Sequence, residues 1–313
     1  MKTLEVVRFA VAAAMVPVML VQQGFAWGAG GHTMINGLAC AALPADVPEF
    51  LRSPAARAAM ERYGPEPDHW KETGEPELKA AGEPDHFINM EWADLTVSPL
   101  PRKRYEFIRA LAYAQKAHPE ATLTPEGTGL LPYAIDESYE RLKAAMRGYR
   151  TLSTNHEDTK PIEAEIVFLA GILGHWVADG SQPLHTTTQY NGWTLPNPNG
   201  YTTEHRIHSQ FETAFVRAAV TDPVKDVAPL IPVKARVIDD VFEEDVKYIR
   251  HSNSMVEQVY KFEKAGALSG TGTAGSRAFV DERLAAGATE LRDIIYTAWV
   301  KSGDPLPPYR GQP

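Results

Sequence analysis

The sequence predicts an all-α protein, a single compact multi-helix domain. Apolar residues recur at helical spacing along most of the chain, whereas the apolar–polar alternation of a half-buried strand is scarce. The chain has 313 residues, of which 44% are hydrophobic and 23% charged, so it can bury a sizeable core. This composition excludes a disordered tail and a collagen-like fibre. Because Cys40 is the only cysteine, it also excludes a disulfide scaffold.

Residues 1–26 are expected to be a secretory signal peptide. An apolar run over residues 9–21 follows a basic start, and small residues precede the expected cleavage after Ala26. The alternative is a membrane anchor, but the run is shorter than the about 20 residues that span a bilayer, and it contains Pro17. We therefore expect an exported protein, periplasmic or secreted, whose mature domain covers residues 27–313.

The helices of the mature chain are predicted from apolar spacing and from their flanking prolines. Pro44 ends the first helix, and Pro161 opens a helix that is apolar on nearly every side over residues 166–176, so it should be buried all round. The expected helices cover residues 33–43, 102–117, 135–149, 161 to beyond 176, 203–219, 235–264 and 277–299. Long irregular stretches are expected over 64–101 and 186–202, a flexible connection over 266–276, and a tail over 305–313.

The charge of the chain argues at first against a polyanionic partner. The sequence has 31 Lys and Arg against 40 Asp and Glu, a formal net charge of −9. No general basic surface is therefore available to hold nucleic acid through counterion release.

A histidine and an aspartate four residues apart lie in the most apolar predicted helix. His175 and Asp179 would project from one face of that helix, and burying both without partners would be costly. The simplest interpretation of an isolated pair is a hydrogen-bonded core pair. His185 favours a binding site instead. Gln182 and Pro183 end the helix, which allows the chain to bring a third ligand-type side chain to the same end.

A second pair of the same kind follows in the next predicted helix, where His208 and Glu212 are again four residues apart. With His175, Asp179 and His185 they make five ligand-type residues from two helices. This set suggests zinc, because zinc sites take histidine nitrogen and carboxylate oxygen. Asp179 could bridge two ions.

The start of the predicted mature chain offers further ligands. Cleavage after Ala26 would leave a free α-amine at Trp27 beside its own carbonyl oxygen, a ready five-membered chelate. The reference pKa of an α-amine is about 7.7–8.0, so a metal can displace its proton near neutral pH. The intervening glycines would let the segment fold close to a metal, with His32 as another nitrogen ligand. Taken alone, the segment would be interpreted as a glycine-rich start with a capping histidine.

Four motifs occur in chain order and resemble those of one superfamily. They are Trp27 followed by His32; His86-Phe87-Ile88-Asn89; His175-x3-Asp179-x5-His185 with Gln182-Pro183-Leu184; and His208-Ser209-x-Phe211-Glu212. Together they resemble the zinc-dependent single-strand-specific nucleases and bacterial zinc phospholipases C. The resemblance extends to the last predicted helix, from Arg283 onward. It implies an all-helical fold with a buried trinuclear zinc cluster.

The resemblance also implies which residues hold each ion. One zinc would be held by Asp68, His86, His175 and Asp179; a second by the Trp27 amine and carbonyl, His32 and the bridging Asp179; the third by His185, His208 and Glu212. Asp85, adjacent to His86, competes with Asp68, because the loop between Asp68 and His86 differs in length from the nuclease pattern.

Three further residues take substrate-binding roles by the same resemblance. Lys71 lies where the nucleases place a phosphate-contacting arginine, and it preserves the charge without the bidentate fork. It is also expected to act in catalysis, by stabilising charge on the phosphoryl oxygens and the leaving oxygen together with the third zinc. Phe87 corresponds to an aromatic residue against which a nucleobase stacks, although a core position is equally compatible with its sequence. Asn89 lies near the base-recognition position. Asp68 would orient or deprotonate the attacking water, which two close zinc ions would acidify.

The implied function is cleavage of single-stranded DNA and RNA, with 3′-nucleotidase activity as a further expectation. The spacing from Trp27 to His32 and from His185 to His208 matches the nucleases, while Glu212 stands where they usually have Asp. The alternative function is that of a phospholipase C acting on phospholipid. A third interpretation is an exported protein that binds zinc without catalysing a reaction. No stable protein partner is implied.

Two points of the sequence bear on the substrate. Three Zn²⁺ would bring +6 against −3 from Asp68, Asp179 and Glu212, so a polyanion could bind at the cluster despite the net charge of the chain. Tyr190 and Trp193, which follow His185, could stack on bases or contact lipid chains, and the sequence leaves both open.

Overall fold

The computed structural model describes residues 27–306, and the expected signal peptide and the last seven residues lie outside this range. The described residues form helices and no strand, apart from isolated bridges between Ile88 and Gly129 and between Tyr190 and Gly192. The prediction of an all-α protein is confirmed. One hydrophobic cluster contains buried side chains from Trp27 through to Ala298.

The helical segments follow one another closely along the chain. In chain order they are α1 (Gly28–Ala41), α2 (Glu49–Arg52), α3 (Pro54–Tyr63), α4 (Glu66–Glu72), α5 (Pro76–Gly82), η1 (Glu83–His86), α6 (Met90–Thr96), α7 (Arg104–Ala117), α8 (Pro125–Thr128), α9 (Leu131–Thr154), α10 (Lys160–Ser181), η2 (Pro183–Thr186), α11 (Ile207–Ser209), η3 (Gln210–Phe215), α12 (Val216–Ala219), α13 (Pro223–Asp226), η4 (Ala228–Leu230), α14 (Val241–Asn253), α15 (Val256–Lys264) and α16 (Ala274–Lys301). η3 is a π-helix, and the other three η segments are 3₁₀-helices.

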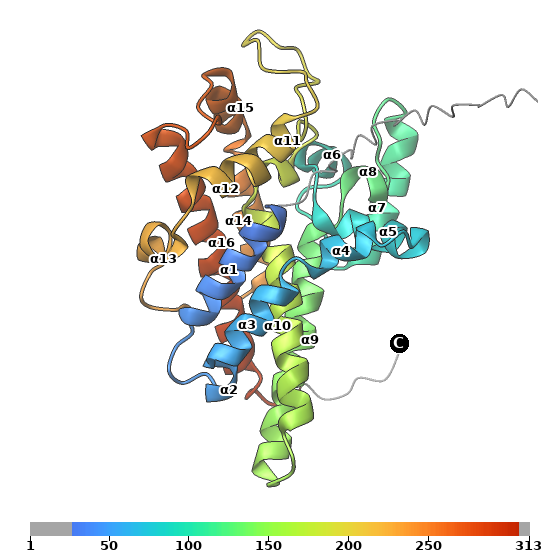
Figure 1. The fold of residues 1–313 in the computed structure, drawn as a ribbon. Helices are drawn as coiled ribbons and strands as arrows, with labels where there is room; N and C mark the ends of the chain where they lie inside the picture. Colours follow the sequence, from blue (N-terminus) through green and yellow to red (C-terminus); the bar gives the residue numbers. More distant parts are fainter. Residues whose placement is uncertain (1–26, 307–313) are drawn as a thin grey trace, which may run out of the picture.

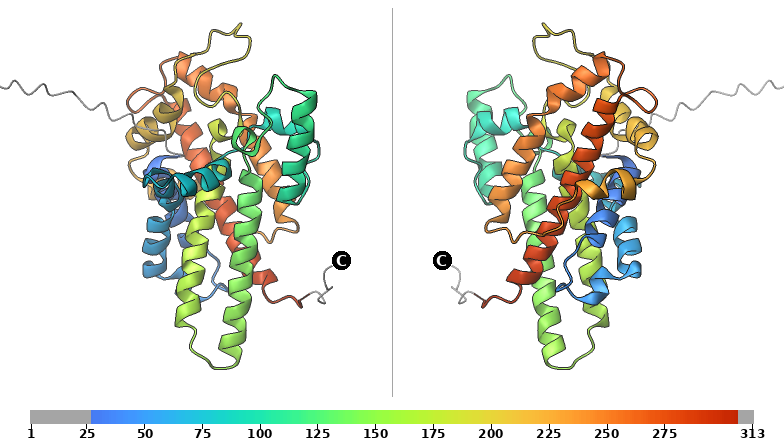
Figure 2. Two further views of the ribbon diagram at one scale, coloured as in Figure 1. Left: turned by 90° about the vertical axis from the view of Figure 1, so that its right-hand side faces the viewer. Right: turned by 90° about the vertical axis from the view of Figure 1, so that its left-hand side faces the viewer.

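Helix α10 is the centre of the fold. It packs against α9, α3, α16, α1 and α14, and the short elements α4, η1 and η2 contact it as well. Figures 1 and 2 show α9 and α10 side by side, with the loop that joins them projecting at one end of the molecule. The helices α4 to α8 lie together on one side in Figure 1, and α1, α11, α12 and α16 lie on the other.

The burial of α10 is shifted by about one turn from the prediction. Residues 170–181 are buried on every side, but Phe168, inside the stretch expected to be buried, is 37% exposed. The reason is that the first turns of α10 project with α9 beyond the other helices. By length and composition α10 could also cross a membrane, but most of it is buried against its neighbours, which is typical of a core helix.

The stretch expected to be irregular over residues 64–101 instead contains α4, α5, η1 and α6. Each has seven residues or fewer, too short for an apolar period to be visible in the sequence. The first three each have a proline in the first turn, where its missing N–H costs nothing. This correction matters because α4 and η1 carry the predicted ligands Asp68 and His86.

Two other helices and one connecting segment also differ from the prediction. The helix expected from residue 203 begins at Ile207 and turns into the π-helix η3. The helix expected over 235–264 begins at Val241 and is divided between α14 and α15. The segment 266–276, expected to be a connection, includes the first residues of α16, which begins at Ala274 and is capped by Thr273 together with the buried Ser276. Cys40 is buried and free, as a lone cysteine requires.

Helix α1 begins at Gly28, five residues earlier than predicted. The side chain of Trp27 folds back over its first turn, and a Cβ added at Gly31 would lie 2.7 Å from the Trp27 Cβ. The absence of a side chain at Gly31 therefore lets the buried indole lie against the helix that carries His32.

Candidate metal centre

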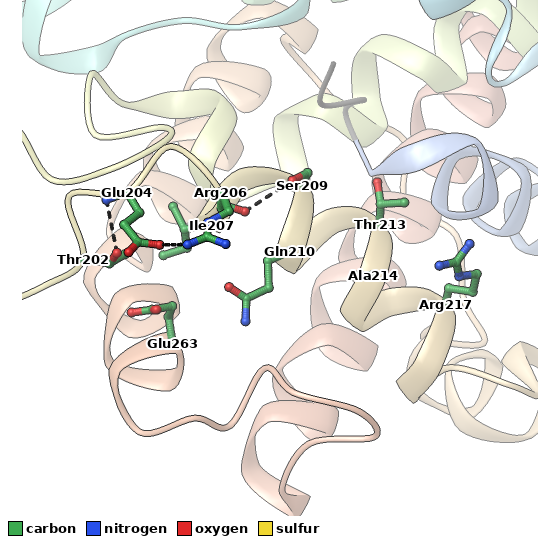
Figure 3. A pocket seen from close by; sticks show the side chains of 10 residues that line it. All are labelled: Thr202, Glu204, Arg206, Ile207, Ser209, Gln210, Thr213, Ala214, Arg217 and Glu263. Carbon is green, nitrogen blue, oxygen red and sulfur yellow. Dashed lines mark hydrogen bonds and ion pairs between the residues drawn. The ribbon is translucent and has the colours of Figure 1, made fainter. Parts of the chain in front are cut away.

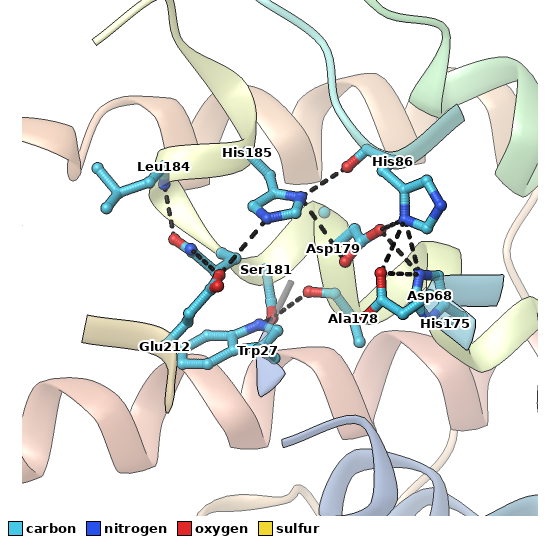
Figure 4. Close-up of polar contacts among 12 residues, drawn as sticks. Trp27, Asp68, His86, His175, Ala178, Asp179, Ser181, Leu184, His185 and Glu212 are labelled. Atoms are coloured by element: carbon cyan, nitrogen blue, oxygen red, sulfur yellow. Dashed lines mark hydrogen bonds and ion pairs between the residues drawn. The ribbon is translucent and has the colours of Figure 1, made fainter. Parts of the chain in front are cut away.

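The ligand-type side chains predicted from the sequence converge at the C-terminal end of α10. His175 and Asp179 project from one face of this helix and are fully buried. Around them, the chain brings together residues from six other elements, as Figure 4 shows for most of the set. These are His32 from α1, Asp68 from α4, His86 from η1, His185 from η2, His208 from α11 and Glu212 from η3.

Three groups within this set have ligand atoms close enough to hold a metal ion, all within 4.8 Å of one another in each group. The first is His32, His175 and Asp179. The His32 Nε2 lies 3.5 Å from Asp179 Oδ1, and the His175 Nε2 lies 3.3 Å from Asp179 Oδ2. The two imidazole rings stack with their centroids 4.0 Å apart.

The second group is Asp68, His86 and His175. The His86 Nδ1 lies 3.6 Å from Asp68 Oδ1 and 2.9 Å from His175 Nε2. Asp85, the competing candidate, points elsewhere: its Oδ1 pairs with Arg104 Nη1 at 2.6 Å. The geometry therefore places Asp68, and not Asp85, among the potential ligands.

The third group is His185, His208 and Glu212. The His208 Nε2 lies 2.8 Å from Glu212 Oε2 and 3.2 Å from His185 Nε2. Asp179 connects this group to the first, because its Oδ1 is 3.7 Å from His185 Nδ1. The geometry is thus compatible with the sequence-based idea that Asp179 contacts more than one ion.

Backbone carbonyls orient three of the histidines. The Nδ1 atoms of His175, His185 and His208 lie 2.7, 2.6 and 3.1 Å from the carbonyl oxygens of Gly64, His86 and Tyr190, respectively. A carbonyl only accepts hydrogen bonds, so each Nδ1 must donate, and each Nε2 keeps its lone pair for the centre. This is the arrangement by which proteins fix metal-binding histidines.

Several buried polar atoms at the centre lack a hydrogen-bond partner among residues 27–306. They include both ring nitrogens of His32, the Nε2 of His86, Asp68 Oδ2, Asp179 Oδ1 and Glu212 Oε1. Unpartnered buried donors and acceptors are rare in proteins because they lose their hydration without compensation. Cations held among these atoms would compensate the loss, so the donor set fits metal ions.

The protonation states suit the same interpretation. Burial lowers the pKa of His32 to about 3 and that of His86 to about 4, which leaves both imidazoles neutral at physiological pH. Burial alone would raise the pKa of Asp68, but the neighbouring His175 imidazole and Lys71 ammonium outweigh burial and lower this pKa to about 2. Neutral imidazole and ionised carboxylate are the forms that bind metals.

The side chain of Trp27 lies against the end of α10, and its backbone carbonyl oxygen already accepts one hydrogen bond. The buried indole Nε1 donates to Ser181 Oγ at 2.7 Å, two residues after Asp179. The carbonyl oxygen expected to chelate a metal accepts the N–H of Gly31 at 3.0 Å. One lone pair of that oxygen remains.

A cavity of about 640 Å³ opens beside the centre. His86, His185 and His208 line it, together with Lys71, Phe87, Asn89 and Tyr190 among the residues singled out in the sequence. Lys71 pairs with Asp68 through its Nζ, 2.8 Å from Oδ1. Phe87 is partly exposed at the cavity and is therefore not a core residue.

Two predicted contacts have other roles in the fold. The Asn89 Nδ2 donates to the Gly127 carbonyl at 2.7 Å and so holds α8 in place. Trp193 packs against Tyr201 and Tyr260, with ring centroids 4.8 and 5.1 Å away, and does not line the cavity. Of the two loop aromatics, only Tyr190 is available to a ligand there, and it is 53% exposed.

Some residues that act through the backbone or from distant elements were not predicted from the sequence. Gly64 supplies a carbonyl, which no sequence signal reveals. Gln182 Nε2 donates to Glu212 Oε2 at 3.2 Å, and its place between two predicted ligands could have suggested this role. Glu83, Trp92 and Glu126 line the cavity and belong to no recognised motif.

A separate surface pocket of about 440 Å³ lies over the outer side of α11, η3 and α12 (Figure 3). None of the ligand-type residues lines it; Ser209, Gln210 and Thr213 do, beside the exposed Arg217. The pocket thus uses the opposite side of the segment that carries His208 and Glu212.

Comparisons with protein-family models, with curated proteins and with solved structures found no match to this chain.

Proposed function

We propose that this chain is an exported zinc-dependent phosphodiesterase that cleaves single-stranded DNA and RNA and also hydrolyses 3′-nucleotides. The observation that carries the proposal is the convergence of three histidine–carboxylate groups beside a cavity that also presents a lysine and an aromatic ring. In chain order these residues are the ones that resemble the nuclease and phospholipase C superfamily.

The cavity supports a catalytic role over a purely structural one. Structural zinc sites are closed by four protein ligands, whereas catalytic sites leave a position open to solvent or substrate. Here His86, His185 and His208 all line the cavity, so a ligand in it would reach the donors of the second and third groups.

Zinc is the metal that suits the donors best, since they are imidazole nitrogens and carboxylate oxygens without thiolate. We assign Asp68, His86, His175 and Asp179 to one ion; the Trp27 backbone, His32 and Asp179 to a second; and His185, His208 and Glu212 to a third. Bound zinc would supply a Lewis acid for phosphoryl oxygens and would lower the pKa of water.

The side chains of the chain itself would then position the substrate. Lys71 presents an ammonium at the edge of the centre, where it can balance charge on phosphoryl oxygens, and its contact with Asp68 fixes the direction of that carboxylate. Asp68 Oδ2, which makes no hydrogen bond within the described residues, would orient a water or accept its proton. Phe87 offers a ring face to one base.

The test is an assay of metal-depleted protein, with and without added zinc, on single-stranded DNA, RNA, a 3′-nucleotide and phosphatidylcholine. We expect zinc-dependent cleavage of the first three. His185→Ala should abolish it, and His118→Ala, which changes a histidine outside the centre, should not. Full activity without zinc would overturn the proposal, and zinc-dependent hydrolysis of phosphatidylcholine alone would favour a phospholipase C.

A further inference from the structure

Two glutamates line the cavity beside the metal centre. Glu83 begins η1 and Glu126 lies in α8. These two elements pack against each other, so both glutamates lie on the same side of the cavity. Both residues are exposed, and neither has an ion-pair partner within residues 27–306. We call this pair the acidic rim.

Positive charge around the cavity is scarce. Lys71 is the only Lys or Arg among its lining residues in the described part of the chain, and its ammonium is already paired with Asp68. Metal ions at the centre would add positive charge only at the end formed by the histidines. The cavity therefore combines one site for a phosphate group with a rim that repels further negative charge.

The dimensions of the cavity match a small ligand. Its volume of about 640 Å³ is within the range of about 300–1,000 Å³ typical of pockets that enclose small molecules. Phe87 and Trp92 provide aromatic surface for one base. A long strand has a negative charge at every phosphate. A strand that runs along the cavity from a phosphate at the histidines would bring its neighbouring phosphates near the rim.

We propose that the acidic rim, Glu83 and Glu126, makes the site favour short phosphate esters that carry a single phosphate, such as a nucleoside 3′-phosphate or a dinucleoside monophosphate, over the long strands that it also cleaves. Long single strands are cleaved less efficiently because their additional phosphates meet the two carboxylates. This inference rests on the proposed function and names the substrate class of the same site.

The experiment compares the wild-type zinc-loaded protein with Glu83→Gln/Glu126→Gln. Each is assayed on a dinucleoside monophosphate and on a single-stranded oligonucleotide of about 20 nucleotides, at low and high salt. The matched control is Glu77→Gln/Glu165→Gln, which makes the same change of net charge at two exposed glutamates outside the cavity.

At low salt, we expect the rim variant to have a kcat/KM for the oligonucleotide about three- to tenfold higher than that of the wild type. Its kcat/KM for the dinucleoside monophosphate should change much less. The gain should shrink at high salt, where charges are screened, and should be absent in the control. An unchanged ratio of the two substrates in the rim variant, with active wild-type enzyme, overturns the inference and leaves the proposed function standing. Wild-type protein that cleaves neither substrate with zinc overturns both.

Discussion

His175 donates from Nδ1 to the carbonyl oxygen of Gly64 at 2.7 Å, and its Nε2 faces His86 at 2.9 Å. One ring nitrogen is thus fixed by the backbone between α3 and α4, while the other is directed at the centre. Because His175 belongs to two of the three potential ligand groups, the position of one carbonyl affects both.

Gly64→Ala should weaken metal binding without touching a ligand. A Cβ at this position would lie 3.0 Å from the His32 carbonyl oxygen and 2.9 Å from Asn36 Nδ2, so the segment has to move, and its carbonyl with it. We expect zinc affinity, measured by competition with a chelator, to fall about tenfold or more. Gly30→Ala is the control, since its Cβ would meet nothing within 4 Å. Wild-type affinity in folded Gly64→Ala protein would contradict the orienting role.

Asp68 and Asp85 should respond differently to the same amide substitution. Asp68→Asn removes a buried carboxylate 3.6 Å from His86 Nδ1, so bound zinc and activity should both fall. Asp85→Asn only weakens an ion pair with Arg104, which also pairs with Glu137 at 2.8 Å, so zinc content should persist. Elemental analysis of both variants decides the assignment, and loss of zinc from Asp85→Asn alone would reverse it.

Glu290 should make the fold less stable as the pH rises. Burial raises its pKa from 4.5 to about 7, although Arg236 opposes the shift. Below the pKa of 4.5 that applies to the unfolded chain, the Glu290 carboxyl is protonated in both the folded and the unfolded state. Between pH 4.5 and about 7 only the unfolded state ionises readily, so up to about 3 kcal/mol of stability is lost.

Glu290→Gln removes this dependence. In zinc-free protein we expect little difference from wild type at pH 4.5 and a higher denaturation midpoint for the variant at pH 8. Arg236 keeps partners in the variant, since it also bonds Asp293 at 3.0 Å and Glu244 at 3.0 Å. Glu165→Gln, at an exposed position, serves as the control. A variant that is destabilised at pH 8 but not at pH 4.5 would show that the charged form of Glu290 is the favourable one.

The residue before Trp27 should matter for metal content. A chain produced with methionine directly before Trp27 has an amide in place of the free α-amine that we assign to one ion. We expect it to bind less zinc than a chain that begins at Trp27, while the hydrogen bond from the Trp27 indole to Ser181 persists. Equal zinc content in the two preparations would exclude the α-amine as a ligand.

The sequence predicts what depends on local spacing. The i, i+4 relation of His175 and Asp179 and the end of α10 before Pro183 follow from the period of one α-helix. His208 and Glu212 are paired as well, although the chain passes from α11 into the π-helix η3 between them. These features are in the structure as predicted. The stretch of α10 expected to be buried lies about one turn too early in the sequence, because burial depends on where the neighbouring helices end.

Longer-range relations were not available from spacing. Whether Asp68 or Asp85 turns toward His86 depends on α4, a helix of seven residues with no visible period, and on Arg104, which draws Asp85 away. The carbonyl of Gly64 leaves no mark in the side-chain pattern. The resemblance of ordered motifs supplied the expectation that these distant segments meet.

The most direct test of the central claim is the number of zinc ions bound per chain, measured by elemental analysis on protein that begins at Trp27. We expect about three, falling in Asp179→Asn because its carboxylate lies within 3.5 Å of His32, His86 and His175 nitrogens. A single tightly bound zinc, or none, would contradict the trinuclear centre and the phosphodiesterase mechanism built on it.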